Sequence, residues 1–201
     1  MKTSQTRFGL ISHSVYLFIA VFFLVSCSKQ DVTQVANNTQ NEESILRNGA
    51  PAPGTQPIAQ IAINAGFSEL VAALSYVDGE LNTGLVNLFL NGTDQYTVFA
   101  PTNAAFQNLY TALNVNGINQ LPATLVRDVL LYHVVEGRRG ANSVVPRIGN
   151  KNISTLLQVG FSVNPQGKIT AVGNTANITA ANISASNGII HVIDAVILPI
   201  N

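Results

Sequence analysis

The sequence predicts an α+β domain, in which several short helices flank a wedge or sandwich of β-strands. Three observations lead to this class: a helical spacing of apolar residues between positions 57 and 130, strand-like segments with turn signals from residue 161, and an apolar run over residues 189–198. Because the helices precede the strands instead of alternating with them, we expect helices packed on an antiparallel sheet or wedge. The chain has no internal repeat, so a single domain is expected.

Four amphipathic helices are predicted in the first part of the domain. Apolar residues recur at intervals of three and four positions in the segments 57–65, 67–74, 106–113 and 125–130. Pro57 suits the first turn of the first helix, and Pro122 opens the fourth. Thr102 or Asn103 is expected to cap the third, because short polar side chains accept hydrogen bonds from the first free backbone N–H groups.

Strands are predicted in the second part. A hairpin is expected over residues 161–172, with its turn at Pro165-Gln166-Gly167, and a further strand or strand pair over residues 177–186. Asn187-Gly188 is a strong tight-turn signal, because both residues tolerate a positive φ. The closing run 189–198 is apolar on both faces, which predicts a central strand and not an edge strand.

The amino-terminal segment has the features of an export signal. Lys2 and Arg7 give a positive start, and residues 15–25 form an uninterrupted apolar run of 11 residues. A transmembrane helix needs roughly 18 or more apolar residues, so this run is too short to span a bilayer and is typical of a signal peptide. The chain is therefore predicted to be exported, with residues 1–26 removed.

The signal ends in Leu24-Val25-Ser26-Cys27, which resembles the lipobox of bacterial lipoproteins. That resemblance implies a diacylglycerol on the thiol of Cys27, cleavage just before it and acylation of the new amino group. Several acyl chains would anchor the protein stably, since each buried methylene contributes roughly 0.8 kcal/mol. The alternative is an ordinary secretory signal with a chance cysteine. By analogy with known sorting rules, Ser28 favours the outer membrane, and the side that the domain faces stays open.

A polar segment separates Cys27 from the predicted domain. Residues 28–56 are rich in Asn, Gln, Ser, Thr and Pro and have no sustained periodicity, which predicts a flexible tether. The predicted organisation is therefore a cleaved signal peptide at 1–26, a lipidated cysteine and tether at 27–56, and one folded domain at 57–201.

Three segments of the folded part, in order, resemble the fasciclin domain. Residues 96–106 (YTVFAPTNAAF) are similar to its first signature, residues 130–137 (LLYHVVEG) to its Tyr-His segment, and residues 187–199 (NGIIHVIDAVILP) to its closing signature. The resemblance covers nearly all of the folded part. The family commonly has Asp where this chain has Asn103, so a neutral contact replaces a charged one. The resemblance implies a compact wedge of strands flanked by helices, and adhesion or extracellular recognition without catalysis or a cofactor.

The resemblance also indicates candidate binding residues. In animal relatives the Tyr-His region is linked to receptor binding, which carries over only to Tyr132 and His133. Arg138 and Arg139 follow in an expected exposed loop and could engage an acidic glycan or a partner. More commonly such a pair forms a solvated turn, and the apolar neighbours of Tyr132 favour a packed tyrosine. The residues expected to have structural roles in the motifs are Thr102, Asn103, His191 and Asp194.

No metal or catalytic site is expected. His133 and His191 are each followed three residues later by an acid, Glu136 and Asp194, and a zinc site needs three or four converging ligands. On a strand, however, His191 and Asp194 would point to opposite faces. We therefore expect both histidines to be buried and hydrogen-bonded, holding loops to the sheet. A Gly-x-Ser-x-Gly nucleophile turn is missing from the sequence.

The composition of the chain argues against further classes of function and site. Charged residues make up 10% of the chain and its formal net charge is zero, so no basic face large enough for nucleic acid is expected. A single Cys excludes an intramolecular disulfide and a multi-cysteine metal site. The predicted function is adhesion to, or recognition of, a protein or polysaccharide at the cell envelope or surface. The alternatives are a structural lipoprotein that organises a larger assembly and a hydrolase of envelope polymers; the oligomeric state stays open.

Overall fold

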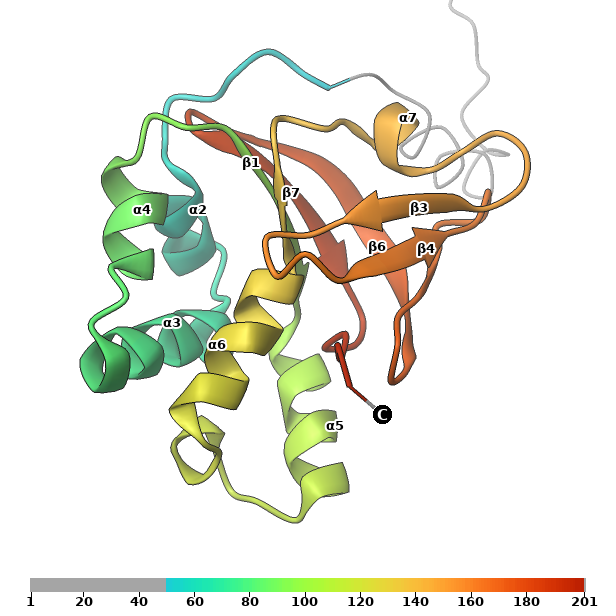
Figure 1. The fold of residues 1–201 in the computed structure, drawn as a ribbon. Coiled ribbons are helices and arrows are strands. Elements are labelled where there is room, and N and C mark those ends of the chain that lie inside the picture. Colours follow the sequence, from blue (N-terminus) through green and yellow to red (C-terminus); the bar gives the residue numbers. More distant parts are fainter. Residues whose placement is uncertain (1–49, 201) are drawn as a thin grey trace, which may run out of the picture. The chain divides into compact units, whose positions relative to one another are not determined.

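The computed structural model describes residues 50–200, which belong to one compact unit (Figure 1). The predicted signal peptide, Cys27 and the tether up to residue 49 lie outside the described residues. Within residues 50–200, no helix is both long enough and apolar enough to cross a membrane.

The described chain forms short helices and a sheet, with most of the helices before most of the strands. The helices are α2 Ile58–Asn64, α3 Ser68–Leu81, α4 Leu85–Asn91, α5 Asn103–Leu113, the 3-10 helix η1 Ile118–Gln120, α6 Ala123–Tyr132 and α7 Ala141–Val144. The strands are β1 Tyr96–Pro101, β2 Val134–Glu136, β3 Lys151–Ser154, β4 Gly160–Val163, β5 Lys168–Thr170, β6 Thr175–Ala185 and β7 Gly188–Ile193. The predicted α+β class is confirmed.

The seven strands form one mixed sheet in the order β2-β1-β7-β6-β5-β4-β3. β1 and β7 run parallel, with Tyr96 opposite Gly188 and Pro101 opposite Ile193, whereas the other neighbouring strands are antiparallel. The expectation of an antiparallel sheet is therefore wrong for the β1–β7 pair. A parallel pair needs a long connection, and most of the domain lies between these two strands in the sequence.

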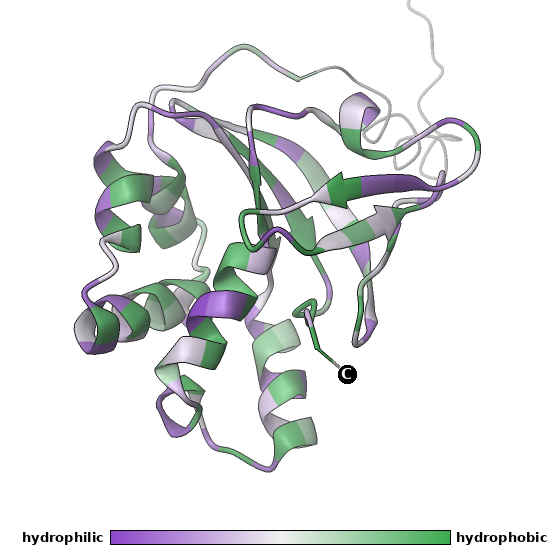
Figure 2. Ribbon diagram, viewed as in Figure 1, coloured by the Kyte–Doolittle hydropathy of each residue, from purple (hydrophilic) through white to green (hydrophobic). Residues whose placement is uncertain are grey.

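The sheet separates two apolar clusters. Val98 and Ala100 of β1 belong to the cluster that the helices cover, whereas Phe99 lies in the other cluster and contacts Phe161 of β4 edge-on, with ring centroids 5.0 Å apart. This division follows from the strand backbone, which directs successive side chains to opposite faces. The helices α3, α5 and α6 carry both hydrophobic and hydrophilic residues along their lengths, as expected of helices with one buried side (Figure 2).

The four predicted helices are confirmed as α2, α3, α5 and α6, and side chains explain where two of them begin. Thr102 caps α5, because its Oγ1 accepts from the backbone N of Ala105 at 3.2 Å. Asn103 acts on a different helix: its Oδ1 accepts from the N of Glu69 at 3.2 Å, and its Nδ2 donates to the oxygen of Gly66 at 2.9 Å. Asn103 therefore caps the start of α3, which has no capping side chain of its own.

α4 was not predicted. Its first turn is capped by a carboxylate from α3. Asp78 accepts hydrogen bonds from the backbone N–H groups of Leu85 and Val86, both at 2.8 Å, and from the hydroxyl of Thr83. Partial burial raises the pKa of this carboxyl, but the hydrogen bonds from Thr83, Val86 and Leu85 lower it, and the net pKa lies below the ordinary value of 3.8. Asp78 is therefore a negative cap at a helix start.

The closing strand is central and buried along its length, as predicted, but it is shorter than the sequence suggested. β7 ends at Ile193, and Asp194 is exposed instead of continuing the strand. The carboxylate of Asp194 accepts from the backbone N of Asn177 at 2.7 Å and from its side chain at 2.8 Å. Asp194 thus fastens the chain after β7 to the start of β6.

The turn before β7 lies one residue earlier than predicted. Ala185 pairs with Gly188 across a two-residue loop, so the turn residues are Ser186 and Asn187. Asn187 is buried, and its side chain accepts from the N of Ile58 at 2.8 Å and donates to the oxygen of Phe89 at 3.0 Å. This residue therefore joins the β6–β7 turn to α2 and α4.

Residues 50–56 lie against the domain, so the tether predicted through residue 56 is wrong for these residues. The N of Gly54 donates to the oxygen of Ala185 at 3.2 Å, and the N of Ser186 donates to the oxygen of Gln56 at 2.8 Å. We call residues 50–56 the strap; it runs from α2 over one end of the sheet (Figure 1).

Candidate functional site

The Tyr-His segment lies where α6 ends and β2 begins. Tyr132 is the last residue of α6 and is fully buried. Its hydroxyl donates to the oxygen of Gly160 at 2.9 Å, and its ring contacts Phe161 edge-on, with centroids 5.8 Å apart. Burial raises the pKa of this phenol. The expected packed tyrosine is confirmed, and the Tyr132 side chain offers no surface to a partner in this conformation.

His133 follows Tyr132 and connects two segments of the chain through its imidazole. The Nδ1 atom lies 2.7 Å from the oxygen of Val129, and Nε2 lies 3.0 Å from the backbone N of Ile197. A backbone N–H can only donate, so Nε2 must be the acceptor and Nδ1 must carry the proton. The ring is buried, and this burial lowers the pKa of His133 to about 4. His133 is therefore a neutral link between α6 and the segment after β7.

His191 of β7 has the same arrangement with the two nitrogens exchanged. Nδ1 accepts from the N of Asn182 at 3.3 Å, so Nε2 carries the proton and donates to the oxygen of Arg139 at 2.9 Å. The ring lies 5.5 Å from that of Phe99 and is fully buried, which lowers its pKa below the ordinary value of 6.5. The expectation that both histidines are buried and hydrogen-bonded is confirmed, and His191 holds the loop with Arg139 to the sheet, whereas His133 joins α6 to the segment after β7. Neither imidazole is free to act as a general base.

Arg138 is half-buried, and the expectation of an exposed, solvated residue is wrong for it. Its Nη2 donates to the oxygens of Pro51 and Ala52 in the strap at 3.1 and 3.2 Å, and its Nη1 donates to the oxygen of Ala185 at 2.9 Å. Further acceptors are the oxygen of Gly188 and the hydroxyl of Ser184. Burial lowers the pKa of this guanidinium from its usual value. Arg138 therefore joins the strap to the β6–β7 hairpin.

Arg139 lies beside this cluster and is also only partly exposed. Its backbone N donates to the hydroxyl of Thr97 at 2.8 Å, and its Nε donates to the oxygen of Glu136 at 3.1 Å. The Thr97 hydroxyl donates in turn to the oxygen of Gly137 at 2.6 Å. The loop that carries both arginines is thus fixed to β1.

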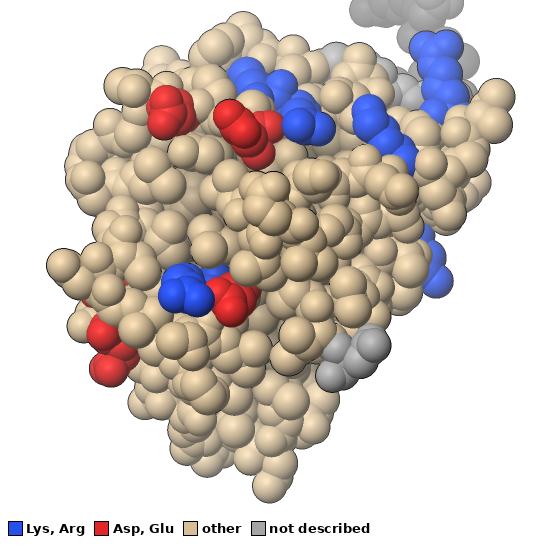
Figure 3. All heavy atoms as spheres, in the orientation of Figure 1, with Lys and Arg blue, Asp and Glu red and all other residues tan. Residues whose placement is uncertain are grey.

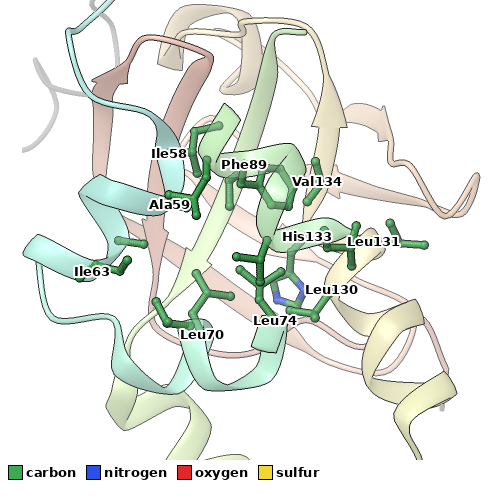
Figure 4. Close-up of a pocket in the computed structure, with 16 residues that line it drawn as sticks. Ile58, Ala59, Ile63, Leu70, Leu74, Phe89, Leu130, Leu131, His133 and Val134 are labelled. Carbon is green, nitrogen blue, oxygen red and sulfur yellow. The ribbon is translucent and has the colours of Figure 1, made fainter. Parts of the chain in front are cut away.

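An apolar pocket lies next to His133, between α2, α3, α4, α6 and β1 (Figure 4). It has a volume of about 50 Å³, and aliphatic and aromatic side chains line it, including Ile58, Leu74, Phe89 and Val134. His133 is the one polar residue in its lining, and both ring nitrogens are already bonded to the backbone. The pocket therefore offers apolar contact and no group that could perform acid–base or metal chemistry.

The structure does not bring the predicted site residues together into one site. Tyr132 and His133 point into the interior, Arg138 binds the strap, and Asp194 lies beyond β7 beside β6. Among residues 50–200, no group of three or more His, Cys, Asp and Glu side chains is arranged to hold a metal ion.

Sequence reasoning missed several polar residues that hold this region. Asn182, at a φ of 64°, accepts with its Oδ1 from the N of Ala141 at 2.9 Å and so fixes α7. Asn187 was noted only as a turn residue, although it is buried and bonded on both sides. Asn and Asp tolerate such conformations, but the sequence gives no sign of their distant partners.

Comparisons with known proteins give one consistent result. Residues 65–199 match the family model described as the fasciclin domain. The immunogenic protein MPB70 of Mycobacterium bovis is 37% identical over 148 residues, which cover 71% of this chain and 69% of that protein. The cell surface glycolipoprotein MPB83 of the same species is 34% identical over 148 residues, which cover 71% of this chain and 60% of that protein. A solved FAS1 domain pair from the insect cell adhesion molecule fasciclin I gives a TM-score of 0.45 at 18% identity, covering 66% of this chain and 46% of that one.

Proposed function

Because this chain belongs to the fasciclin domain family, we propose that it is a lipid-anchored envelope protein that binds a protein or polysaccharide at the cell envelope or surface. Family membership over residues 65–199 is the observation that carries the binding role. The proposed location is the outer membrane, with the domain held on a tether that begins at the lipid on Cys27.

Two observations support the anchor. The residues before Cys27 have the lipobox pattern, and Cys27 is the only cysteine in the chain. The similar protein MPB83 is named a cell surface glycolipoprotein. Anchored acyl chains would keep many copies of one domain on one surface, and this raises the effective concentration of a weak binding face.

The side chains of the domain favour binding over catalysis. Apart from His13 in the predicted signal, the histidines of the chain are His133 and His191. Each imidazole uses one nitrogen to bond a backbone N–H and the other to bond a carbonyl, and burial keeps both rings neutral near pH 7. A hydrolase would need one of these rings beside a nucleophile in an accessible pocket.

A binding screen tests this proposal. The chain from residue 27, with Cys27→Ala to keep it soluble, is applied to arrays of matrix proteins and envelope polysaccharides and to whole cells. We expect saturable binding to at least one of these surfaces. No saturable binding to any of them would contradict the adhesion role. Recovery of one stoichiometric envelope partner after mild detergent extraction would favour the structural alternative instead.

A further inference from the structure

One aliphatic side chain protrudes from the domain far more than any other large apolar residue of residues 50–200. Ile148 is 91% exposed, whereas the other exposed large apolar residues, Leu113, Val172, Ile63 and Ile200, are between 45% and 52% exposed. Ile148 lies in the loop of residues 145–150 between α7 and β3, which we call the Ile148 loop. A single exposed aliphatic residue is ordinary on a protein surface, so its surroundings decide whether it has a role.

The Ile148 loop is held at both ends. Val144 and Val145 are buried at its start, and Ile153 is buried in β3 soon after its end. The Nζ of Lys151 donates to the oxygen of Ser143 at 2.5 Å and ties the two ends together. The loop therefore presents Ile148 at its tip on a fixed base.

Ile148 lies in a part of the chain that carries basic residues and no acidic ones. Between Glu136 and Asp194 the chain has five basic residues, Arg138, Arg139, Arg147, Lys151 and Lys168, and no acidic residue. From residue 50 to Glu136 it has six acidic residues and one basic residue. The near-neutral domain is therefore charged unevenly: in Figure 3 the right-hand edge, towards β3 and β4, carries blue atoms and no red ones. Arg147 directly precedes Ile148 and is exposed.

The chain enters the domain close to this loop. Ala50 lies so near Gly140 that a Cβ on Gly140 would be 2.3 Å from the N of Ala50, and α7 begins at the next residue, Ala141. Arg138 holds the strap in this position. The segment that leads back to Cys27 therefore starts at the end of the domain that carries α7. A flexible tether of roughly twenty residues has a root-mean-square length of about 25 Å.

We infer that the Ile148 loop contacts the bilayer in which Cys27 is anchored, with Ile148 among the lipid headgroups and Arg147 and Lys151 beside anionic lipid phosphates. This inference rests on the proposed lipid anchor. An aliphatic tip with flanking cations matches the membrane interface, where apolar groups reach the acyl boundary and cations meet negative headgroups. Each cation near the surface raises the affinity for an anionic membrane about fivefold, and two such cations are too few to bind a soluble domain to the membrane. The tether makes the contact intramolecular, so weak attraction suffices.

The test uses the full lipidated chain, purified from membranes and reconstituted into vesicles of phosphatidylcholine and phosphatidylglycerol. An Ile148→Cys variant is labelled with an environment-sensitive dye, because the Cys27 thiol is consumed by the lipid and leaves the new thiol as the reactive one. Leu113→Cys at the end of α5, distant from α7 (Figure 1), is the matched control. We expect a blue-shifted emission and quenching by nitroxide lipids for the label at 148 and neither change at 113. Arg147→Glu should reduce the shift, and so should pure phosphatidylcholine vesicles.

The outcomes separate this inference from its premise. A chain that floats with the vesicles but gives no shift at position 148 overturns the loop contact and leaves the anchor intact. An equal shift at positions 113 and 148 also overturns it, because the contact would then have no orientation. A chain that does not float overturns the lipid anchor and the loop contact together.

Discussion

Acidification from pH 7 to pH 4 should destabilise the domain through His133. Folding depresses the pKa of this imidazole from 6.5 to about 4, because burial of the ring disfavours its charged form. Protonation would also break the hydrogen bond that Nε2 accepts from the N–H of Ile197. Because one pKa unit corresponds to 1.36 kcal/mol, the difference between the unfolded and folded pKa of His133 corresponds to about 3 kcal/mol of folding free energy. The neutral ring contributes fully above pH 6.5, and its contribution is lost as the pH falls from 6.5 towards 4, where only the unfolded chain binds the proton.

Urea denaturation followed by circular dichroism measures this loss. The soluble Cys27→Ala chain is compared at pH 7, 6, 5 and 4 with the same chain carrying His133→Gln. At pH 7 the variant should be less stable by about 1–3 kcal/mol, because two backbone groups lose their partner. At pH 4 the balance should have shifted by about 3 kcal/mol in favour of the Gln variant, since Gln does not titrate, so the variant should be as stable as the parent chain or more stable. A stability difference that stays constant from pH 7 to pH 4 would refute the reasoning. Both chains contain His191, so its contribution to the pH dependence cancels in the difference between their unfolding free energies.

Two further predictions concern the polar residues that join separate segments. Arg138→Ala should destabilise the fold by about 2 kcal/mol and release the strap, because the carbonyls of Pro51 and Ala52 lose their donor. Limited proteolysis should then cut near residue 52 faster than in the parent chain, and unchanged cutting would count against the contact. Asp78→Ala should cost about 1–2 kcal/mol by uncapping α4. Because the folded pKa of Asp78 is lowered, this contribution should be fully present above the unfolded value of 3.8 and decline as the pH falls through the lowered value; a cost that does not decrease on acidification would contradict it.

Local patterns in the sequence were enough to find the elements whose stability is local. The helices α2, α3, α5 and α6 carry apolar residues at helical spacing, and the β4–β5 hairpin has its own turn signal. α4 has seven residues, with Asn87 and Asn91 on its exposed side, and so short a segment does not establish a helical period; its cap comes from Asp78 in the preceding helix. β2 and β3 have three and four residues, too few to show a clear alternation; β2 pairs with β1, which lies far back in the sequence, and β3 pairs with the following strand β4 at the edge of the sheet. Their positions depend on tertiary contacts that local spacing does not encode.

In the candidate site, too, local sequence patterns predicted burial but not the contacts between distant segments. Burial of Tyr132 and both histidines could be predicted, because apolar neighbours surround them in the sequence. The role of Arg138 could not, since its acceptors lie 46 to 87 positions away in the chain. An arginine pair in a glycine-flanked loop has the composition of a solvated turn, and only the fold places the strap over one member of the pair.

Mass spectrometry of the mature amino terminus tests the central claim, that a lipid on Cys27 holds this fasciclin domain at a membrane. Trypsin should release Cys27-Ser28-Lys29 from the protein purified out of membranes. The proposal predicts that this peptide carries a diacylglycerol on sulfur and an acyl group on nitrogen, and that a Cys27→Ala chain leaves the membrane fraction with its domain folded. An amino terminus other than Cys27, or an unmodified thiol on the membrane-bound protein, would contradict it.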